Sequence, residues 1–191
     1  IIGGGVVGCS VLYHLTKGGW SDVVLIERSE LTSGSTWHAA GGFHTLNADP
    51  NMAALQGYTI RLYRELEEIT GMSCGLHHVG GLTIADTPER LDFLKAERAK
   101  HRHMGLSTEI VGPEEIAKIS PITNTEGILG ALYDPLDGHL DPSGTTHAYA
   151  KAARMAGAEI YLRNRVLELN QRPDDHWDVV TEQGTIVAEH V

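Results

Sequence analysis

The sequence is poor in cysteine and lacks any long apolar run. Cys9 and Cys74 are its only cysteines, so a disulfide scaffold is not indicated and a reducing compartment fits. No apolar run is long enough to span a membrane, so we expect no membrane partner. No signal peptide is visible, but the chain begins with Ile1 and not with Met, and we expect further chain upstream.

Positive charge is also scarce. The chain has 15 Lys and Arg residues against 25 Asp and Glu residues, which gives a formal net charge of −10. Binding to nucleic-acid phosphates needs clustered cations, and the nearest approach to a basic patch, residues 95–102, contains Glu97. The helical spacing of that segment favours a solvated helix face. We therefore exclude a nucleic-acid partner. The hydrophobic content of 41% indicates a globular protein.

A glycine-rich turn opens the chain after two apolar residues, 1–2, which are typical of the end of a buried strand. Gly3, Gly5 and Gly8 have the G-x-G-x-x-G spacing of a dinucleotide-binding turn, and a helix pattern runs over 6–17. In such a turn the first glycine allows the tight bend and the second admits the pyrophosphate to the backbone. The third lets helix and strand approach closely, and the pyrophosphate lies at the helix N-terminus.

A second strand and an acidic residue complete this pattern. Residues 18–19 are both glycine and end the helix, and residues 23–26 form a short β-branched run. Glu27 follows, nineteen residues after Gly8, where the acid that binds the ribose of a dinucleotide is expected. The sequence therefore predicts a dinucleotide site held by the three glycines and Glu27.

A loop almost free of bulky aliphatic side chains follows, from Thr32 to Gly42. His38, beside Trp37, can act as a ligand, a base or a nucleophile, and the last role allows a covalent cofactor bond. A solvated turn is the alternative for a loop of this composition. The small residues around His38 supply hydroxyl groups and room for a ligand, and we assign these as cofactor-binding candidates: Gly34, Ser35, Thr36, Gly41 and Gly42.

The segment from Glu27 to Gly41, which reads Glu-Arg-Ser-Glu-Leu-Thr-Ser-Gly-Ser-Thr-Trp-His-Ala-Ala-Gly, resembles the dimethylglycine and sarcosine dehydrogenase family. The segment 137–142, Asp-Gly-His-Leu-Asp-Pro, also resembles that family, so the likeness spans essentially the whole chain. In this family the His after Trp carries FAD through its 8α-methyl group. The resemblance therefore implies FAD, covalently held by His38, with Arg28 among the cofactor-binding residues.

The resemblance also implies a fold. We expect a Rossmann-like FAD-binding domain of the amino-acid-oxidase type, interrupted by part of an α+β substrate domain and truncated at both ends. The boundaries that we predict are 1–75 for the first part of the FAD-binding domain, 76–135 for the substrate-domain portion and 136–191 for the continued FAD-binding domain. A strand should follow Val191, so we expect the isolated fragment to be poorly stable, sticky and inactive.

Periodicity and turn signals predict the remaining elements. Apolar residues at helical spacing indicate an amphipathic helix over 51–70 with this buried face: Leu55, Tyr58, Leu62, Leu66 and Ile69. Further helices are predicted over 88–104, 113–119 and 142–156, the last with Asp141 as its N-cap. Further strands are predicted over 80–85, 127–133, 159–162, 166–170, 177–181 and 185–187.

Two residues keep alternative readings. The backbone of Val166 lies against the adenine if the resemblance holds, and otherwise Val166 is an ordinary half-buried strand residue. Arg61 either reaches a substrate carboxylate or forms a surface pair with Glu65. No Lys or Arg lies between His38 and Arg61, where some amine oxidases use a cation to hold the substrate carboxylate.

Metal binding is not expected. The pairs His77-His78 and His101-x-His103 have neither a nearby Cys nor a carboxylate at ligand spacing.

The predicted function is oxidative demethylation of dimethylglycine or sarcosine, with hydride transfer from the N-methyl carbon to flavin N5. The catalytic base is not assigned. A small N-methylated amine or amino acid, an electron acceptor and tetrahydrofolate bound by a downstream domain are the expected partners. The expected location is the bacterial cytoplasm or the mitochondrial matrix. The alternatives are a non-catalytic flavin-binding subunit, a deaminating oxidase and a nicotinamide dehydrogenase, which would have no use for Trp37-His38.

Overall fold

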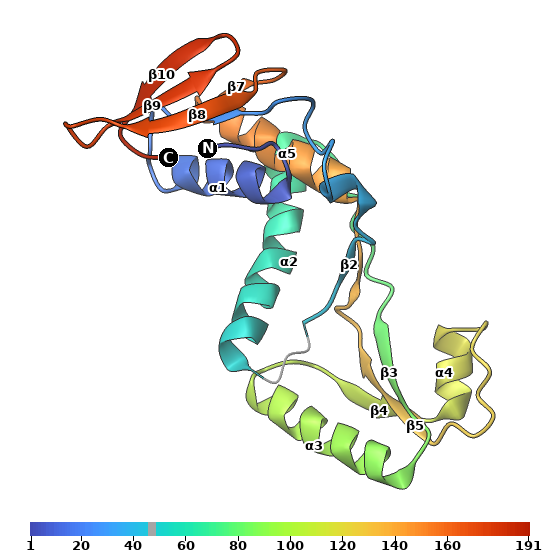
Figure 1. The fold of residues 1–191 in the computed structure, drawn as a ribbon. Helices are drawn as coiled ribbons and strands as arrows, with labels where there is room; N and C mark the ends of the chain where they lie inside the picture. Colours follow the sequence, from blue (N-terminus) through green and yellow to red (C-terminus); the bar gives the residue numbers. More distant parts are fainter. Residues whose placement is uncertain (46–48) are drawn as a thin grey trace. The chain divides into compact units, whose positions relative to one another are not determined.

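The computed structural model of the protein describes residues 1–45 and 49–191 as a mixed α/β structure (Figure 1). The chain forms two compact units. The first unit comprises Ile1–Gly41, Tyr63–Gly75 and Asp141–Val191, and the second comprises Gly42–Leu62 and Leu76–Leu140. Residues 42–62 and 136–140 thus belong with the inserted unit, whereas the sequence analysis assigned them to the FAD-binding domain.

The first unit contains a short parallel sheet covered by helices. Its elements are α1 (Val6–Lys17), β1 (Val24–Ile26), the 3₁₀ turn η1 (Thr36–His38), the end of α2 (Pro50–Thr70), α5 (Pro142–Met155) and β7 (Glu159–Tyr161). β1 pairs with β7 in parallel, and Ile2 forms an isolated parallel bridge with Ile26. The side chains of Leu12 and Leu25 are fully buried and form part of the core.

Helices α1 and α5 lie side by side in this unit (Figure 1). The rings of Tyr13 on α1 and Tyr149 on α5 approach to 5.6 Å between centroids. Small residues on α5, among them Ala148 and Ala153, are fully buried and allow the close approach. The side chain of Asp141 caps α5 by accepting a hydrogen bond from the Ser143 N–H at 2.9 Å, which confirms the predicted N-cap.

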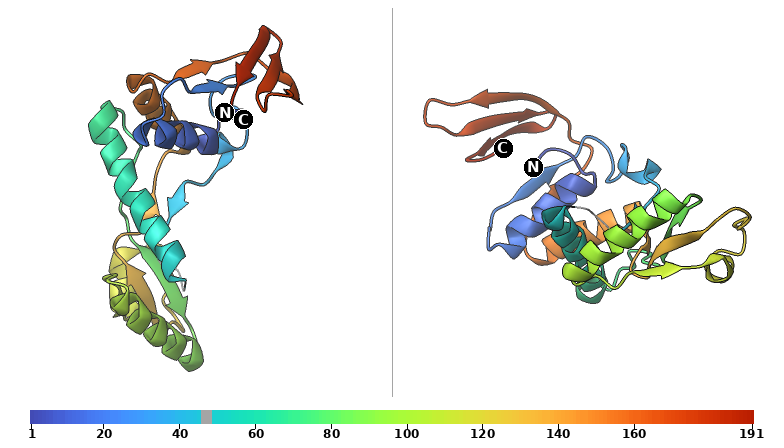
Figure 2. Two further views of the ribbon diagram at one scale, coloured as in Figure 1. Left: turned by 90° about the vertical axis from the view of Figure 1, so that its left-hand side faces the viewer. Right: turned by 90° about the horizontal axis from the view of Figure 1, so that it is seen from below.

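A three-stranded antiparallel sheet completes the first unit. Its strands are β8 (Val166–Gln171), β9 (Trp177–Thr181) and β10 (Gly184–Ala188), in the order β10-β9-β8. Both views in Figure 2 show it as a layer distinct from α1 and α5. The three predicted strands are confirmed, and they pair in antiparallel fashion.

The second unit is built on the antiparallel sheet β3-β5-β4, with β3 at Gly81–Ala85, β5 at Gly130–Asp134 and β4 at Glu109–Val111. Because side chains alternate along a strand, neighbouring residues of β5 face opposite sides of the sheet. Leu132 packs with Leu94 of α3 (Pro88–His103), and Ala131 packs with Ile116 of α4 (Pro113–Ile119). The two helices thus cover opposite faces of the sheet (Figure 1).

A second, two-residue ribbon belongs to this unit. β2 (Gly42–Phe43) pairs with β6 (Gly138–His139), and His139 also bridges to His77. The sequence analysis did not predict β2 and β6, because two residues carry no periodic signal, and it did not predict β4 either.

Two expectations about burial are wrong. Of the five apolar positions predicted to form the buried face of α2, Leu62 and Leu66 are buried, but Leu55, Tyr58 and Ile69 are 56%, 37% and 47% exposed. The helix passes from the second unit into the first at residues 62–63, so its covering neighbours change along its length. The opening strand is not buried either, because Ile2 is 46% exposed.

Candidate cofactor-binding site

The glycine turn has the geometry that a close backbone bend requires. Gly3 has φ of +104°, a conformation that favours glycine, and its N–H donates to the Ile26 carbonyl at 2.9 Å. A Cβ atom added at Gly8 would overlap the Gly3 carbonyl oxygen. Only glycine at position 8 therefore lets α1 begin so close to the turn.

The start of α1 is capped from a distant part of the chain. Gly5 is the N-cap residue and offers no side chain, and the Val6 N–H instead donates to Oγ1 of Thr36 at 3.0 Å. A helix leaves its first-turn N–H groups without intrahelical partners, and such groups bind phosphate. Thr36 takes one of these groups.

The carboxylate of Glu27 binds two backbone N–H groups. Oε2 accepts from Gly4 at 2.6 Å, and Oε1 accepts from Ser29 at 2.8 Å. Glu27 is buried, whereas the neighbouring Arg28 is exposed. A carboxylate has about four lone-pair positions, so these two bonds leave capacity for ribose hydroxyl groups.

Gly4, the middle residue of the three opening glycines, is the residue that sequence reasoning missed. Its N–H donates to Glu27, and its carbonyl accepts from the Thr32 N–H at 3.0 Å. A Cβ at this position would meet the Leu31 side chain at 2.6 Å and Glu27 at 3.1 Å. The run of three glycines was the available signal, but only the spaced pair fits the fingerprint.

The Thr32–Gly42 loop is anchored at its start and exposed further on. Thr32 is buried with φ of +67°, which the bond to Gly4 holds in place. Gly34 and Ser35 are exposed, and a Cβ at Gly34 would meet nothing within 4 Å. The loop therefore combines a fixed origin with open space around its predicted ligand residues.

His38 is exposed at the end of η1. Its Nδ1 lies 3.2 Å from the Gly34 carbonyl oxygen, and its ring lies 3.8 Å from the Trp37 ring at 33°. A bond from Nδ1–H to that carbonyl places the free lone pair on Nε2. Nε2 is thus the ring nitrogen whose lone pair this contact leaves unused.

The region around Glu27 joins two distant segments of the chain. Beyond the ends of β1 and β7 the two segments stay linked, because the Asn164 N–H donates to the Glu27 carbonyl at 3.0 Å and the Arg163 N–H to the Ser29 carbonyl at 3.1 Å. Val166, half-buried, begins β8 two residues later. The structure therefore brings Glu27 near the start of the strand that carries Val166.

Gly41 and Gly42 belong to different units of the structure. Gly41 has φ of +73° and ends the first segment of the first unit, and Gly42 is the first residue of β2 in the second unit. Arg61 also belongs to the second unit, and Glu65, its predicted surface partner, lies 3.5 Å from Nζ of Lys17.

Cys9 lies beside the glycine turn but is no nucleophile. Its side chain is fully buried and lies 3.8 Å from the Gly4 carbonyl oxygen. Burial raises the pKa of the Cys9 thiol to about 11, and the Glu27 carboxylate adds to that rise. The thiol is therefore protonated at neutral pH.

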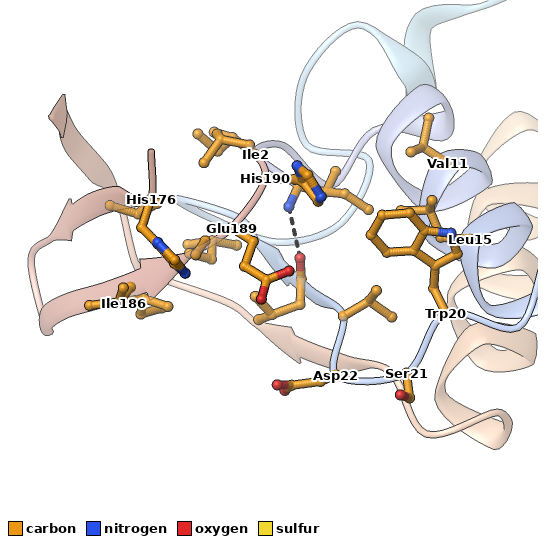
Figure 3. A pocket seen from close by; sticks show the side chains of 18 residues that line it. Ile2, Val11, Leu15, Trp20, Ser21, Asp22, His176, Ile186, Glu189 and His190 are labelled. Carbon is orange, nitrogen blue, oxygen red and sulfur yellow. Dashed lines mark hydrogen bonds between the residues drawn. The ribbon is translucent and has the colours of Figure 1, made fainter. Parts of the chain in front are cut away.

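One hollow of the first unit lies away from these residues. It has a volume of about 700 Å³ and is lined by apolar residues of α1 and β10 together with Trp20 and His190, whose rings lie 5.5 Å apart (Figure 3). None of the predicted cofactor-binding residues lines it. The described residues contain no group of three or more potential metal ligands, and none of their helices is long and apolar enough to cross a membrane.

The protein-family description "FAD dependent oxidoreductase" (DAO) matches residues 1–191. The chain belongs to this family. It is 44% identical over 191 residues to dimethylglycine dehydrogenase of Rattus norvegicus, covering 100% of this chain and 22% of that protein. It is 42% identical over 192 residues to sarcosine dehydrogenase of Homo sapiens, covering 97% of this chain and 21% of that protein. The resemblance stated from the Glu27–Gly41 segment is confirmed.

Two other similarities widen the picture. A regulatory subunit of pyruvate dehydrogenase phosphatase from Mus musculus is 34% identical, covering 100% of this chain and 22% of that protein. The crystal structure of L-proline dehydrogenase from P. horikoshii superposes with a TM-score of 0.86 at 27% identity, covering 97% of this chain and 49% of that one. The amino-acid-oxidase type of α/β fold is confirmed. The chain spans about a fifth of the length of these curated relatives.

Proposed function

We propose that the protein containing this chain is an FAD-dependent dehydrogenase of N-methyl amino acids, with dimethylglycine the first choice of substrate and sarcosine the second. The observation that supports this most directly is the 44% identity to a dimethylglycine dehydrogenase over every residue of the chain. When bound, the flavin supplies an acceptor at N5 for a hydride equivalent from the N-methyl carbon, which leaves a substrate iminium.

The residues present fit FAD. The Gly3–Gly5 turn and the N-terminus of α1 would hold the pyrophosphate, where a side chain at Gly5 would approach Thr36 Oγ1 to 3.0 Å. Glu27 would accept from the ribose hydroxyl groups, and the backbone of Val166 would lie against the adenine. Ser35 and Thr36 would contact the phosphate or ribityl region of the cofactor.

His38 is the proposed covalent attachment point. Its Nδ1 faces the Gly34 carbonyl oxygen at 3.2 Å, which supports Nε2 as the atom bonded to the flavin 8α-methyl carbon. Its exposure leaves room for such a bond. Covalent attachment would keep the cofactor in place and raise its potential.

The partners follow from this chemistry. The reduced flavin needs an electron acceptor, and the one-carbon unit released by demethylation suits tetrahydrofolate bound by another part of the protein. The mitochondrial relatives favour the mitochondrial matrix for a eukaryotic protein and leave the cytoplasm for a bacterial one.

The experiment is anaerobic mixing of the full-length protein with dimethylglycine, sarcosine and α-amino acids. Bleaching of the oxidised flavin band by the N-methyl glycines, with formaldehyde released when folate is absent, supports the proposal. Bleaching only by α-amino acids with a free amino group makes the protein a deaminating oxidase.

A non-catalytic flavin-binding subunit is the second candidate. This candidate is supported by the 34% identity to a phosphatase regulatory subunit, which extends over the whole of this chain. A protein that retains flavin but is not reduced by any of these amines fits this candidate.

Substrate range gives a further comparison. No cation lies between His38 and Arg61, so a carboxylate clamp must come from Arg61 or from chain outside these residues. We expect weaker discrimination against methylamines that lack a carboxylate than a clamp of two cations would give. The ratio of kcat/KM for dimethylglycine to that for trimethylamine measures it.

A further inference from the structure

A buried carboxylate ends β5 in the second unit. Asp134 is 1% exposed, and it accepts hydrogen bonds from three sides. The Leu136 N–H donates to Oδ1 at 2.9 Å, the Thr45 hydroxyl donates to Oδ2, and the side chain of Asp137 is hydrogen-bonded to it. Both carboxyl oxygens of Asp134 therefore act as hydrogen-bond acceptors.

Asp137, three residues after Asp134, lies against one hydrogen-bond donor, the Thr45 N–H, and one acceptor, Asp134. Its Oδ1 accepts from the Thr45 N–H at 3.0 Å, and its side chain also meets Asp134. Its Oδ2 packs over Gly81, where a Cβ atom would overlap it. Asp137 is thus an acceptor toward Thr45 and a donor toward Asp134.

Two carboxyl groups can share a hydrogen bond only when one of them carries a proton. Because both oxygens of Asp134 already accept hydrogen bonds, from Leu136 and Thr45, whereas only Oδ1 of Asp137 does, the proton is placed on Asp137. The pKa of Asp137 is raised to about 7, first by burial and then by the charge and hydrogen bond of Asp134, and the Thr45 N–H opposes the rise. Within the described residues, neither carboxyl group forms an ion pair with Lys or Arg.

Other titratable groups surround the pair. From α3, buried His101 interacts with Asp134 and with Glu97, and burial lowers the pKa of His101. From the ribbon side, His78 Nδ1 lies 3.0 Å from the Leu136 carbonyl oxygen, and the rings of His77 and His139 lie 5.1 Å apart. The charge state of His101 has to be followed alongside that of Asp137.

We propose that Asp134 and Asp137 share one proton that fastens Thr45, two residues after β2, to the end of β5, as a pH-sensitive latch within the second unit. Both polar groups of Thr45 that are bonded, its N–H and its hydroxyl, end on this pair, and Thr45 is 2% exposed. Loss of the proton leaves two buried negative charges side by side, which repel each other. The latch stands whether or not the proposed function holds.

The direction of the pH effect follows from the raised pKa. The folded state holds the Asp137 proton more tightly than the unfolded chain, so the stabilisation is complete below the unfolded pKa of about 4 and is lost as pH rises through about 7. From pH 6 to pH 8.5 the equilibrium between closed and open latch should shift toward open by about tenfold.

Two substitutions distinguish the roles of the carboxyl groups. Asp137→Asn keeps an acceptor for Thr45 and a donor for Asp134, so it imitates the protonated acid and should stay closed at every pH. Asp134→Asn places an amide donor among three donors and should open the latch at both pH values. Asp137→Ala, which removes both bonds, is the control for simple loss of contact.

The test is hydrogen exchange of the peptides covering residues 43–45 and 133–139 in the full-length protein, corrected for the intrinsic pH dependence of exchange. We expect protection to fall by about tenfold from pH 6 to pH 8.5 in the wild type. We expect Asp137→Asn to remove that dependence. An infrared band of a protonated carboxyl group should be present at pH 6 and absent in Asp137→Asn.

Three outcomes would overturn the latch. Wild-type protection that does not change with pH is the first, and exchange of Asp137→Asn as fast as that of Asp137→Ala is the second. The third is loss of protection on adding EDTA at pH 6, which would mean that a divalent cation and not a proton neutralises the pair. If Asp134→Asn fails to fold, the wild-type, Asn and Ala comparisons at position 137 still decide the question.

Discussion

The hydroxyl oxygen of Thr36 accepts a hydrogen bond from the backbone N–H of Val6 at 3.0 Å. Val6 begins the helix that follows the glycine turn, and Thr36 lies two residues before His38 in the loop proposed to carry the flavin. Together with the Thr32 N–H bond to the Gly4 carbonyl, this bond ties the proposed attachment loop to the proposed phosphate site.

Replacing Thr36 by Val should lower both the stability of the α1 start and the retention of flavin. Val keeps the shape of Thr but leaves the Val6 N–H without its cap, at a cost of about 1 kcal/mol. Thr36→Ser keeps the hydroxyl and is the matched control. The flavin-to-protein ratio and the thermal midpoint of the full-length protein should both fall in Thr36→Val and remain near wild type in Thr36→Ser. Equal loss in both variants would count against the cap.

Gly8 and Gly34 should respond to alanine in opposite ways. The added methyl group at Gly8 would overlap the Gly3 carbonyl oxygen, which is backbone and cannot move aside, so a loss of about 1–3 kcal/mol or failure to fold is expected. At Gly34 the methyl group would meet nothing within 4 Å. Denaturant titration of the two full-length variants measures the difference, and similar midpoints would show the turn to be looser than described.

His38→Ala should abolish flavin attachment that resists denaturation. In the wild-type full-length protein the yellow colour should stay with the protein after acid precipitation, because Nε2 is free to form the bond. His44→Ala is the control, since His44 is the next histidine along the chain and is also exposed. Retention of colour by His38→Ala and its loss in His44→Ala would move the linkage to His44.

Glu27→Ala should lower flavin loading at limiting FAD. The change removes the acceptor for the proposed ribose contacts and also releases the N–H groups of Gly4 and Ser29. Hydrogen bonds to a charged group contribute about 1.5–3 kcal/mol each, so stability should fall as well. The reduction potential of the flavin that does bind should change little, because the ribose lies far from N5. An unchanged loading ratio would remove Glu27 from the site.

Short sequence motifs at the starts of helices predicted much of the fold. The G-x-G-x-x-G spacing gave the exact start of α1 at Val6, and Asp141-Pro142 gave the start of α5. Such signals are contained within a few residues, so no knowledge of the rest of the chain is needed. The face of α2 failed for the opposite reason, because what covers Leu55 or Ile69 depends on residues far away in the sequence.

The site was predictable as a set of residues but not as a set of bonds. Glu27 and Thr36 were both assigned to the cofactor, and each also holds a backbone N–H of the glycine turn. Gly4 was passed over because its bonds to Glu27 and Thr32 cross 23 or more positions of sequence. Asp137 begins the segment 137–142 and Asp134 precedes it by three residues, yet their shared partner Thr45 lies 92 and 89 positions earlier in the sequence.

The pairing of β1 with β7 has a consequence for synthesis of the protein. Val24 pairs with Glu159 and Ile26 with Tyr161. More than a hundred further residues are therefore synthesised after β1 before its partner strand leaves the ribosome. Growth at about 5–20 residues per second leaves that edge unpaired for several seconds or more. Contacts of such long sequence separation also slow folding afterwards. While the second unit is being made, this unpaired edge is therefore open to pairing with other chains.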